Sequence, residues 1–142
     1  MTFSAKFEYA CLAVFELAAR HGRGEPVRIR EIAAAHGIPS RFLVQILLQL
    51  KSAGLVHSIR GAAGGYQLAR EPEEITLLDV MMVVDAQLGQ AATSATRNTP
   101  TTRVLQRTWK QVAAKERELL ADVTFAGLVE RLKGAPEGMY YI

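Results

Sequence analysis

Apolar residues recur every three or four positions through several segments of the chain, which is the spacing of a helix that buries one face. The pattern predicts a helix over residues 4–21, a second over residues 30–37 that Gly37 ends, and a third over residues 41–53 that Gly54 ends. Ile38 and Pro39 form a short connection between the second and third helices, and Ser40 is placed to cap the third. Two short helices joined by a turn of about three or four residues form a helix-turn-helix.

Alternating apolar and polar positions follow this motif. Residues 55–59 and 66–69 alternate well enough to be two strands of a hairpin, and the segment between them is its tip. Gly61, Gly64 and Gly65 can adopt positive φ without a Cβ penalty, as such a tip requires. The only Lys, Arg, Asp or Glu in residues 54–68 is Arg60, on that tip.

The C-terminal half is predicted to be helical apart from one loop. Thr76, with Asp79 in the capping-box position, begins a helix, and Thr124 caps a short final one. Residues 86–102 are small and polar without an apolar period, which indicates a loop. A long helix follows from residue 102 to about residue 122, with a heptad-like seam that packs either inward or onto a second copy of the chain. The seam is Leu105, Trp109, Val112, Glu116, Leu119 and Val123.

This pattern divides the chain into three parts. Residues 1–85 form a winged helix-turn-helix domain, residues 86–102 a flexible loop, and residues 103–142 the long helix, a short helix and an apolar tail. The predicted fold class is mainly α with a small β-hairpin wing. No apolar run approaches the roughly 18 residues that a membrane-spanning helix needs, and the N-terminus lacks the order of a signal peptide, so we expect a cytoplasmic protein without membrane contact.

Charge is distributed unevenly along the 142 residues. The net charge is +3, but residues 1–70 hold nine Lys and Arg against four Asp and Glu, whereas residues 71–142 hold eight against ten. The basic half is therefore the one expected to face a polyanion such as double-stranded DNA. A merely soluble surface can be equally uneven, so charge alone does not decide the matter.

A helix-turn-helix followed by a hairpin presents its second helix to the major groove of DNA. The predicted buried face of that helix leaves Arg41, Gln45 and Gln49 on the outer face, where they can hydrogen-bond guanine or adenine edges, while Ser40 suits a phosphate. The alternative is an ordinary solvated helix face. The predicted buried residues are Leu43, Ile46, Leu47 and Leu50.

The hairpin tip is suited to the minor groove. Glycine and alanine make it thin enough to pass between two rows of phosphates, and a narrow minor groove attracts a planar cation such as Arg60. The alternative is a solvent-exposed arginine on a hairpin whose glycines serve only the turn.

Three stretches, "KFEYACLAVFELA", "IREIAAAHGIPSRFLVQILLQLKSAGLV" and "SIRGAAGGYQL", resemble the Rrf-two family of bacterial winged-helix transcription regulators, which includes iron–sulfur, nitric-oxide and cysteine-metabolism regulators. The resemblance implies a homodimer whose long helices cross, with two recognition helices and two wings on a near-palindromic site. Ala62 and Ala63 stand where proline and glycine are frequent, which should change the stiffness of the wing more than its role. The residues expected at the DNA are Arg28, Ser40, Arg41, Gln45, Gln49, Arg60 and Gly61, and those expected at the dimer interface are Leu105, Trp109, Val112, Leu119 and Val123.

Many members of this family hold an iron–sulfur cluster through three cysteines in the loop before the dimer helix. Here that loop contains neither cysteine nor histidine, and Cys11 is the only cysteine of the chain. We therefore expect no iron–sulfur cluster and no metal site, with Glu8 as a surface or salt-bridged residue and Cys11 as a buried apolar residue rather than a redox switch. His21, His36 and His57 lack metal-ligand spacing, and no catalytic motif is present, so we do not expect an enzyme.

Apolar and aromatic residues also occupy the last positions, Met139, Tyr140, Tyr141 and Ile142. They either fold back onto the dimer helices or form a docking peptide, with Tyr140, Tyr141 and Ile142 as the contact residues. Such an ending resembles the cluster-free cysteine-metabolism repressor of the family, whose partner is cysteine synthase.

Together these patterns predict a dimeric, cluster-free DNA-binding transcription regulator, acting as a repressor and linked to cysteine or sulfur metabolism. The alternative is a winged-helix protein-interaction module that no longer binds DNA. Salt dependence separates the two functions, because phosphate contacts release counterions and make log K fall steeply with log salt.

Overall fold

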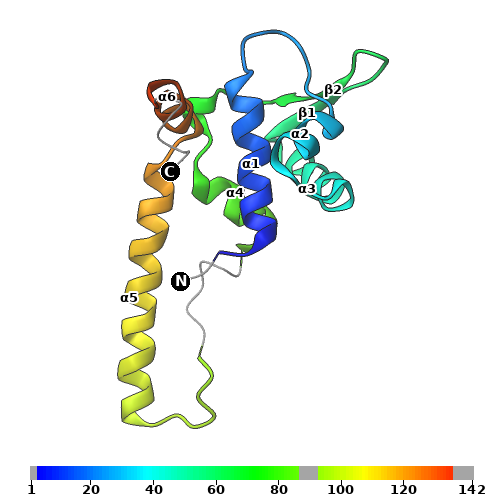
Figure 1. Cartoon of the computed structure of the whole chain (residues 1–142). Coiled ribbons are helices and arrows are strands. Elements are labelled where there is room, and N and C mark those ends of the chain that lie inside the picture. The colour runs from blue at the N-terminus through cyan, green and yellow to red at the C-terminus, as the bar shows by residue number, and fades with distance from the viewer. Residues whose placement is uncertain (1–2, 87–92, 136–142) are drawn as a thin grey trace.

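The computed structural model describes residues 3–86 and 93–135 of the 142-residue chain. Over these residues the protein is mainly helical with one two-stranded antiparallel hairpin, which confirms the predicted fold class. The hairpin and the helix-turn-helix lie on one side of α1, and the long helix α5 lies on the other (Figure 1). The elements are α1 (Ala5–Ala19), α2 (Ile29–His36), α3 (Ser40–Ser52), β1 (Val56–Ile59), β2 (Gly65–Leu68), the short 3-10 helix η1 (Pro72–Glu74), α4 (Leu77–Val84), α5 (Pro100–Asp122) and α6 (Phe125–Gly134).

Helix α1 is the element around which the others pack. The Ser4 hydroxyl accepts a hydrogen bond from the Phe7 N–H at 3.1 Å and so caps its first turn. Because three of its buried residues are alanines, neighbouring helices can approach it closely, and α1 contacts α2, α3, α4, α6 and β2. The helix ends at Ala19, two residues before the predicted end. Its buried residues are Phe7, Ala10, Ala13, Val14, Leu17 and Ala18.

The predicted helix-turn-helix is formed by α2 and α3. Gly37 ends α2 in the left-handed conformation, with φ of 65°, and Ile38 is buried in the connection. The prediction that Ser40 caps α3 was wrong. Pro39 occupies the N-cap position, Ser40 is the first helical residue, and no side chain caps this end. The Pro39 carbonyl accepts from the Leu43 N–H at 3.2 Å. Proline has no N–H, but the first N–H groups of a helix have no partner within it, so Pro39 with its fixed φ is compatible with entry into the helix.

The hairpin forms the predicted wing. Strands β1 and β2 pair antiparallel from Val56 opposite Leu68 to Ile59 opposite Gly65. A third piece of chain joins them, because Val27 exchanges two backbone hydrogen bonds with Tyr66, at 2.9 and 2.8 Å. The wing is thereby attached to the segment that leads into α2.

Helix α4 begins as predicted, with a complete capping box between Thr76 and Asp79. The start of α4 is also hydrogen bonded to the junction of α5 and α6. The Leu77 N–H donates to the Val123 carbonyl at 3.0 Å, and the Phe125 N–H donates to the Ile75 carbonyl at 2.9 Å. This junction fixes the C-terminal end of α5 against the domain.

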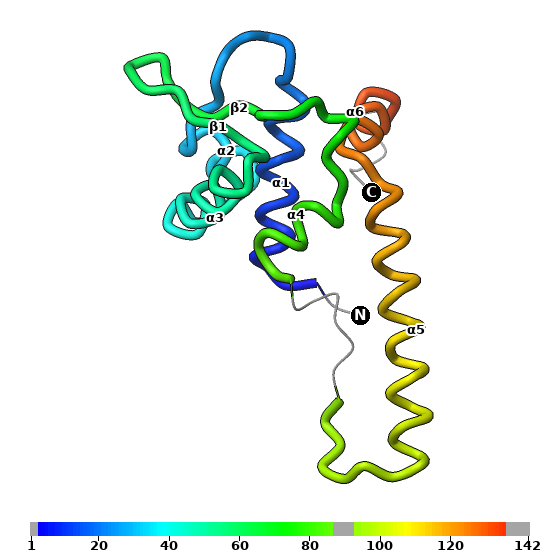
Figure 2. The backbone as a smooth tube through the Cα atoms, turned by 180° about the vertical axis from the view of Figure 1, so that it is seen from behind, coloured from blue at the N-terminus to red at the C-terminus, as the bar shows by residue number. Residues whose placement is uncertain are grey.

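Helix α5 is the longest element, with 23 residues, and most of its length lies beside the domain rather than within it (Figures 1 and 2). It begins at Pro100, two residues before the predicted start, because the Thr99 and Thr102 hydroxyls form a capping box. The last three residues of the predicted loop 86–102 are thus helical. Only Leu120 is buried along α5. Among the described residues, no helix has both the length and the apolar character that crossing a membrane requires.

Candidate nucleic-acid interface

The exposed face of α3 differs in part from the predicted one. Arg41 and Gln45 are exposed as expected, and the four predicted core residues of the helix are 0–1% exposed. Gln49 is half-buried instead, and its Oε1 atom is buried without a hydrogen-bond partner among the described residues. Val44 and Leu48, which the sequence pattern did not predict to be exposed, complete the exposed stripe.

The tip of the wing presents Arg60 to solvent. Gly61 has φ of +109°, which confirms the expectation of positive φ at that position. Gly64 does not have positive φ, so that expectation was wrong for this residue. It must be glycine for a steric reason, because a Cβ there would lie 2.2 Å from the Ile59 carbonyl oxygen.

A cleft runs between the wing and the first turns of α2 and α3. Two arginines line it, Arg28 and Arg30, together with Ser40 and the wing residues Gly61 and Ala62. The Arg28 guanidinium donates a hydrogen bond to the Ala62 carbonyl. The first N–H groups of a helix have no partner within the helix, so this cleft combines cationic side chains with backbone donors, a combination suited to phosphate oxygens.

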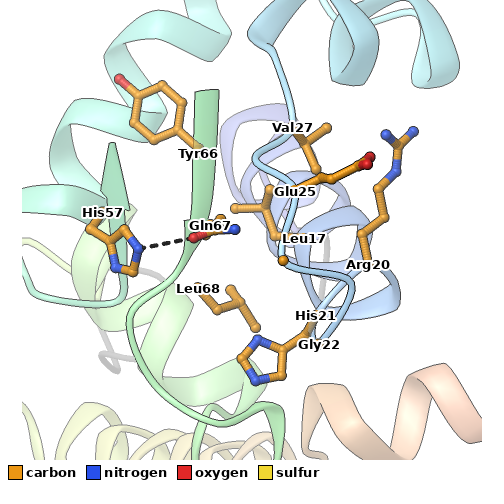
Figure 3. A pocket seen from close by; sticks show the side chains of 11 residues that line it. Leu17, Arg20, His21, Gly22, Glu25, Val27, His57, Tyr66, Gln67 and Leu68 are labelled. Carbon is orange, nitrogen blue, oxygen red and sulfur yellow. Dashed lines mark hydrogen bonds between the residues drawn. The ribbon is translucent and has the colours of Figure 1, made fainter. Parts of the chain in front are cut away.

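A second hollow lies at the base of the wing, between the end of α1 and strand β2 (Figure 3). Several of its polar side chains have partners within the protein. His21 lies 3.1 Å from a Glu71 oxygen, and His57 bonds to Gln67 at 3.3 Å across the hairpin. Arg20 donates to Glu16 and Glu31 instead. The hollow therefore marks where the wing joins α1.

Cys11 lies on α1, packed against the core. Burial, together with a smaller contribution from the negative charge of Glu8, raises the pKa of its thiol from 9.0 to about 12. Because the thiolate is the form that attacks oxidants or binds metal, this thiol is chemically inert near neutral pH.

The predicted seam of α5 points away from the domain in its larger part. Four of its apolar residues are exposed, whereas Val123 and Glu116 are half-buried. Val123 stands at the C-cap of the helix, where the chain turns into α6. The exposed fractions are 48% for Leu105, 46% for Trp109, 52% for Val112 and 68% for Leu119.

These features define a class of protein. A helix-turn-helix whose second helix has an exposed polar face, followed by a hairpin with a cationic tip, is a winged helix-turn-helix, a class that binds DNA. Residues 3–131 match the model of the Rrf2 family, described as an iron-dependent transcriptional regulator. The chain belongs to this family of DNA-binding transcriptional regulators, a family of regulators rather than enzymes.

Individual relatives agree with this assignment. The transcriptional regulator CymR of Bacillus subtilis is 34% identical over 143 residues, covering 100% of both chains. The regulator IscR of Vibrio atlanticus is 30% identical, over 92% of this chain and 76% of that protein. The solved structure of B. subtilis CymR, whose description names it the global cysteine regulator, superposes with a TM-score of 0.79 and 32% identity over 92% of this chain and 98% of that one. The structure of T. potens IscR superposes with a TM-score of 0.77 and 33% identity, over 99% of this chain and 97% of that one.

Proposed function

We propose that this Rrf2-family regulator binds a near-palindromic DNA site by placing α3 in the major groove and the wing tip in the adjacent minor groove. One observation carries the proposal. Helix α3 and the hairpin that carries Arg60 at its tip lie on the same side of the domain, opposite α5 (Figures 1 and 2). The cleft between the wing and the first turns of α2 and α3 is lined by Arg28 and Arg30. A strand of the DNA backbone would lie in that cleft.

Each residue has a proposed role at the DNA. Arg41 and Gln45 contact base edges, and Arg60 contacts the minor groove. Ser40 and Gly61 line the cleft proposed for the DNA backbone. The hydroxyl of Ser40 and the N–H of Gly61 suit phosphate oxygens there. Gln49 is half-buried, and we leave it out of the proposed contacts.

We further propose a homodimer formed through α5. Exposed apolar residues cover this helix on the side away from the domain, including Leu105 and Trp109, and Val104 beside them is 63% exposed. Monomeric proteins seldom expose so many large apolar side chains along one element. A partner helix of the same kind would cover them and would bring two copies of α3 to the two halves of a palindrome.

The chain's donor atoms do not fit a cysteine-ligated iron–sulfur cluster, although the description of the family model names iron. Such clusters are held by several thiolates, and the only cysteine of the sequence is Cys11, whose raised pKa keeps it protonated. We therefore propose that this member regulates transcription without a cluster.

The link to cysteine or sulfur metabolism is likewise a proposal, with the chain acting there as a repressor. It is supported by the full-length similarity to CymR of B. subtilis, whose solved structure is described as that of a global cysteine regulator. The predicted docking residues Tyr140, Tyr141 and Ile142 lie outside the described residues. Deleting Tyr141 and Ile142 is expected to abolish binding to cysteine synthase in calorimetry while the dimer mass stays unchanged, and loss of the dimer would contradict a docking role.

The test of DNA binding is a selection of bound fragments from the host's own DNA, with wild type, Arg60→Ala and Arg70→Ala in parallel. Arg70 is an exposed arginine two residues after β2, away from the tip, so it serves as a charge-matched control. We expect wild type and Arg70→Ala to enrich a near-palindrome and Arg60→Ala to bind it more weakly by about 1–3 kcal/mol, the size of one good groove contact. A wild type that enriches no sequence, or whose affinity does not fall with salt, would favour a protein-interaction module instead.

A further inference from the structure

Two exposed apolar side chains lie in the middle of the proposed DNA-binding face of α3. Val44 and Leu48 are 39% and 46% exposed, whereas Leu43 and Leu47 beside them in sequence are fully buried. Residues 41, 44, 45 and 48 are spaced so that they form one stripe along a helix. The stripe therefore alternates polar and apolar groups, with Val44 placed between Arg41 and Gln45.

The two polar neighbours of Val44 can form hydrogen bonds with bases, but a valine cannot. A shallow hollow with mainly apolar walls lies here, formed by Arg41, Phe42, Val44 and Gln45. In the major groove the apolar group that a base pair presents is the C5-methyl group of thymine. An apolar surface flanked by a guanidinium and an amide is therefore complementary to a thymine that lies beside bases with hydrogen-bonding edges.

Val44 is better placed than Leu48 for such a contact. It lies in the second turn of α3, which begins at Ser40, and the N-terminal residues of a recognition helix are those that contact base edges. Its β-branched side chain also has one strongly preferred rotamer in a helix, so little conformational entropy is lost when a methyl group packs against it. Leu48 lies one turn further along and has more rotamers to lose.

We propose that Val44 contacts the methyl group of a thymine in each half-site and thereby determines the base pair preferred at that position. The inference rests on the proposed mode of DNA binding and adds a residue that hydrogen-bonding arguments leave out. The other candidate occupant of this surface is a second copy of the chain, and the experiment includes it as an outcome.

The experiment begins with selection from a synthetic duplex library of random sequence by the wild-type protein. The enriched duplex is then synthesised with each thymine replaced in turn by deoxyuridine, which removes the methyl group and keeps the hydrogen-bonding edge. Binding is measured for wild type, Val44→Ala and the matched control Leu48→Ala. Both side chains are exposed, so neither substitution removes core packing, and circular dichroism verifies the fold.

We expect one thymine per half-site at which deoxyuridine weakens wild-type binding about fourfold, the value of one buried methyl group. Val44→Ala should weaken binding to the thymine duplex and show no further loss with deoxyuridine at that position. Leu48→Ala should keep the wild-type response.

Three results would overturn the inference. The deoxyuridine effect could persist in Val44→Ala, no thymine could respond in the wild type, or Val44→Ala could lower the dimer mass, which would assign this face to a subunit contact. In the first two cases the wild type still selects a duplex, so the proposed function stands. A subunit contact through this face would also contradict the placement of α3 in the major groove. Selection of no sequence at all would instead overturn the proposed function and this inference with it.

Discussion

The guanidinium of Arg28, directly before α2, donates a hydrogen bond to the carbonyl oxygen of Ala62 at the tip of the wing, 34 residues further along the chain. This contact joins the wing tip to the helix-turn-helix, beside the backbone bridge between Val27 and Tyr66. Arg28 was predicted to contact DNA. Its position in the protein gives it a second role, which is to hold the wing in place.

Arg28→Ala should therefore loosen the wing tip. We expect amide exchange at Gly64, whose N–H donates to the Gly61 carbonyl at 3.0 Å, to become about fivefold faster, the effect of losing roughly 1 kcal/mol of hydrogen bonding. Hydrogen exchange followed by NMR measures this. Arg30→Ala is the matched control, because Arg30 lines the same cleft and carries the same charge. Equal exchange rates in both variants would show that Arg28 does not position the wing.

The dimer proposal predicts that a charge on the exposed seam of α5 separates the subunits. Leu105→Glu and Val112→Glu should each convert a dimer into a monomer in sedimentation, because a carboxylate would have to be buried without a partner. Gln111→Glu introduces the same charge at another exposed position of α5 and should leave the dimer intact. Trp109 fluorescence should shift to longer wavelength in the two monomeric variants, since its ring would become exposed. A wild type that sediments as a monomer would contradict the proposal.

Gly64→Ala tests the steric explanation of the wing tip. The added Cβ would overlap the Ile59 carbonyl, so the turn must rearrange, and we expect the free energy of unfolding to fall by about 1–2 kcal/mol in denaturant titration. Gly134→Ala is the same substitution at a helical position with open space around it, and should stabilise the protein by up to about 1 kcal/mol. Equal stability of the two variants would mean that the tip adapts without cost.

Cys11 should react very slowly in the folded protein. With the pKa of its thiol at about 12 instead of 9.0, the thiolate fraction near neutral pH is lower by about a thousandfold. The folded state therefore retains the proton while the unfolded state releases it above pH 9. As a result, the contribution of this thiol to stability is complete below about pH 9 and is lost as the pH rises toward 12. Alkylation by iodoacetamide, followed by mass spectrometry with and without denaturant, measures the difference. Rapid labelling of the native protein at pH 7.5 would show that the thiol is not protected.

Local chemistry made much of the fold predictable. Thr76 and Asp79 form a capping box at the spacing that identifies one, and Gly37 ends α2 where a helix C-terminus favours glycine. The start of α5 was placed two residues late because its capping box uses the hydroxyl of Thr102 rather than a carboxylate. Ser40 was misplaced for a similar reason, since a serine beside a proline fits either the cap or the first turn.

The candidate site was predictable only as far as it depends on polarity. The exposure of Arg41, Gln45 and Arg60 agrees with the prediction, because hydrogen-bonding side chains on a helix face or a turn tip are visible in the sequence. Their contact with DNA stays a prediction. Val44 and Leu48 were missed because apolar residues were assigned to the core, and a search for the exposed stripe at residues 41, 44, 45 and 48 would have found them. The contact between Arg28 and Ala62 depends on how the wing lies against α2, which no local pattern specifies.

The hydrogen bonds between the start of α4 and the junction of α5 and α6 have a mechanical consequence. They attach the C-terminal end of α5 to the domain. The helix has 23 residues and is about 34 Å long at 1.5 Å per residue, so it acts as a rigid lever held at one end. In the proposed dimer, a change in the crossing angle of two such levers would tilt each domain as a unit, through α4 and α6 to α1 and from there to α3. The separation of the two recognition helices must match one turn of DNA, about 34–36 Å. A protein or small molecule that binds only at α5 would thus alter affinity for DNA without touching a residue of the DNA-binding face.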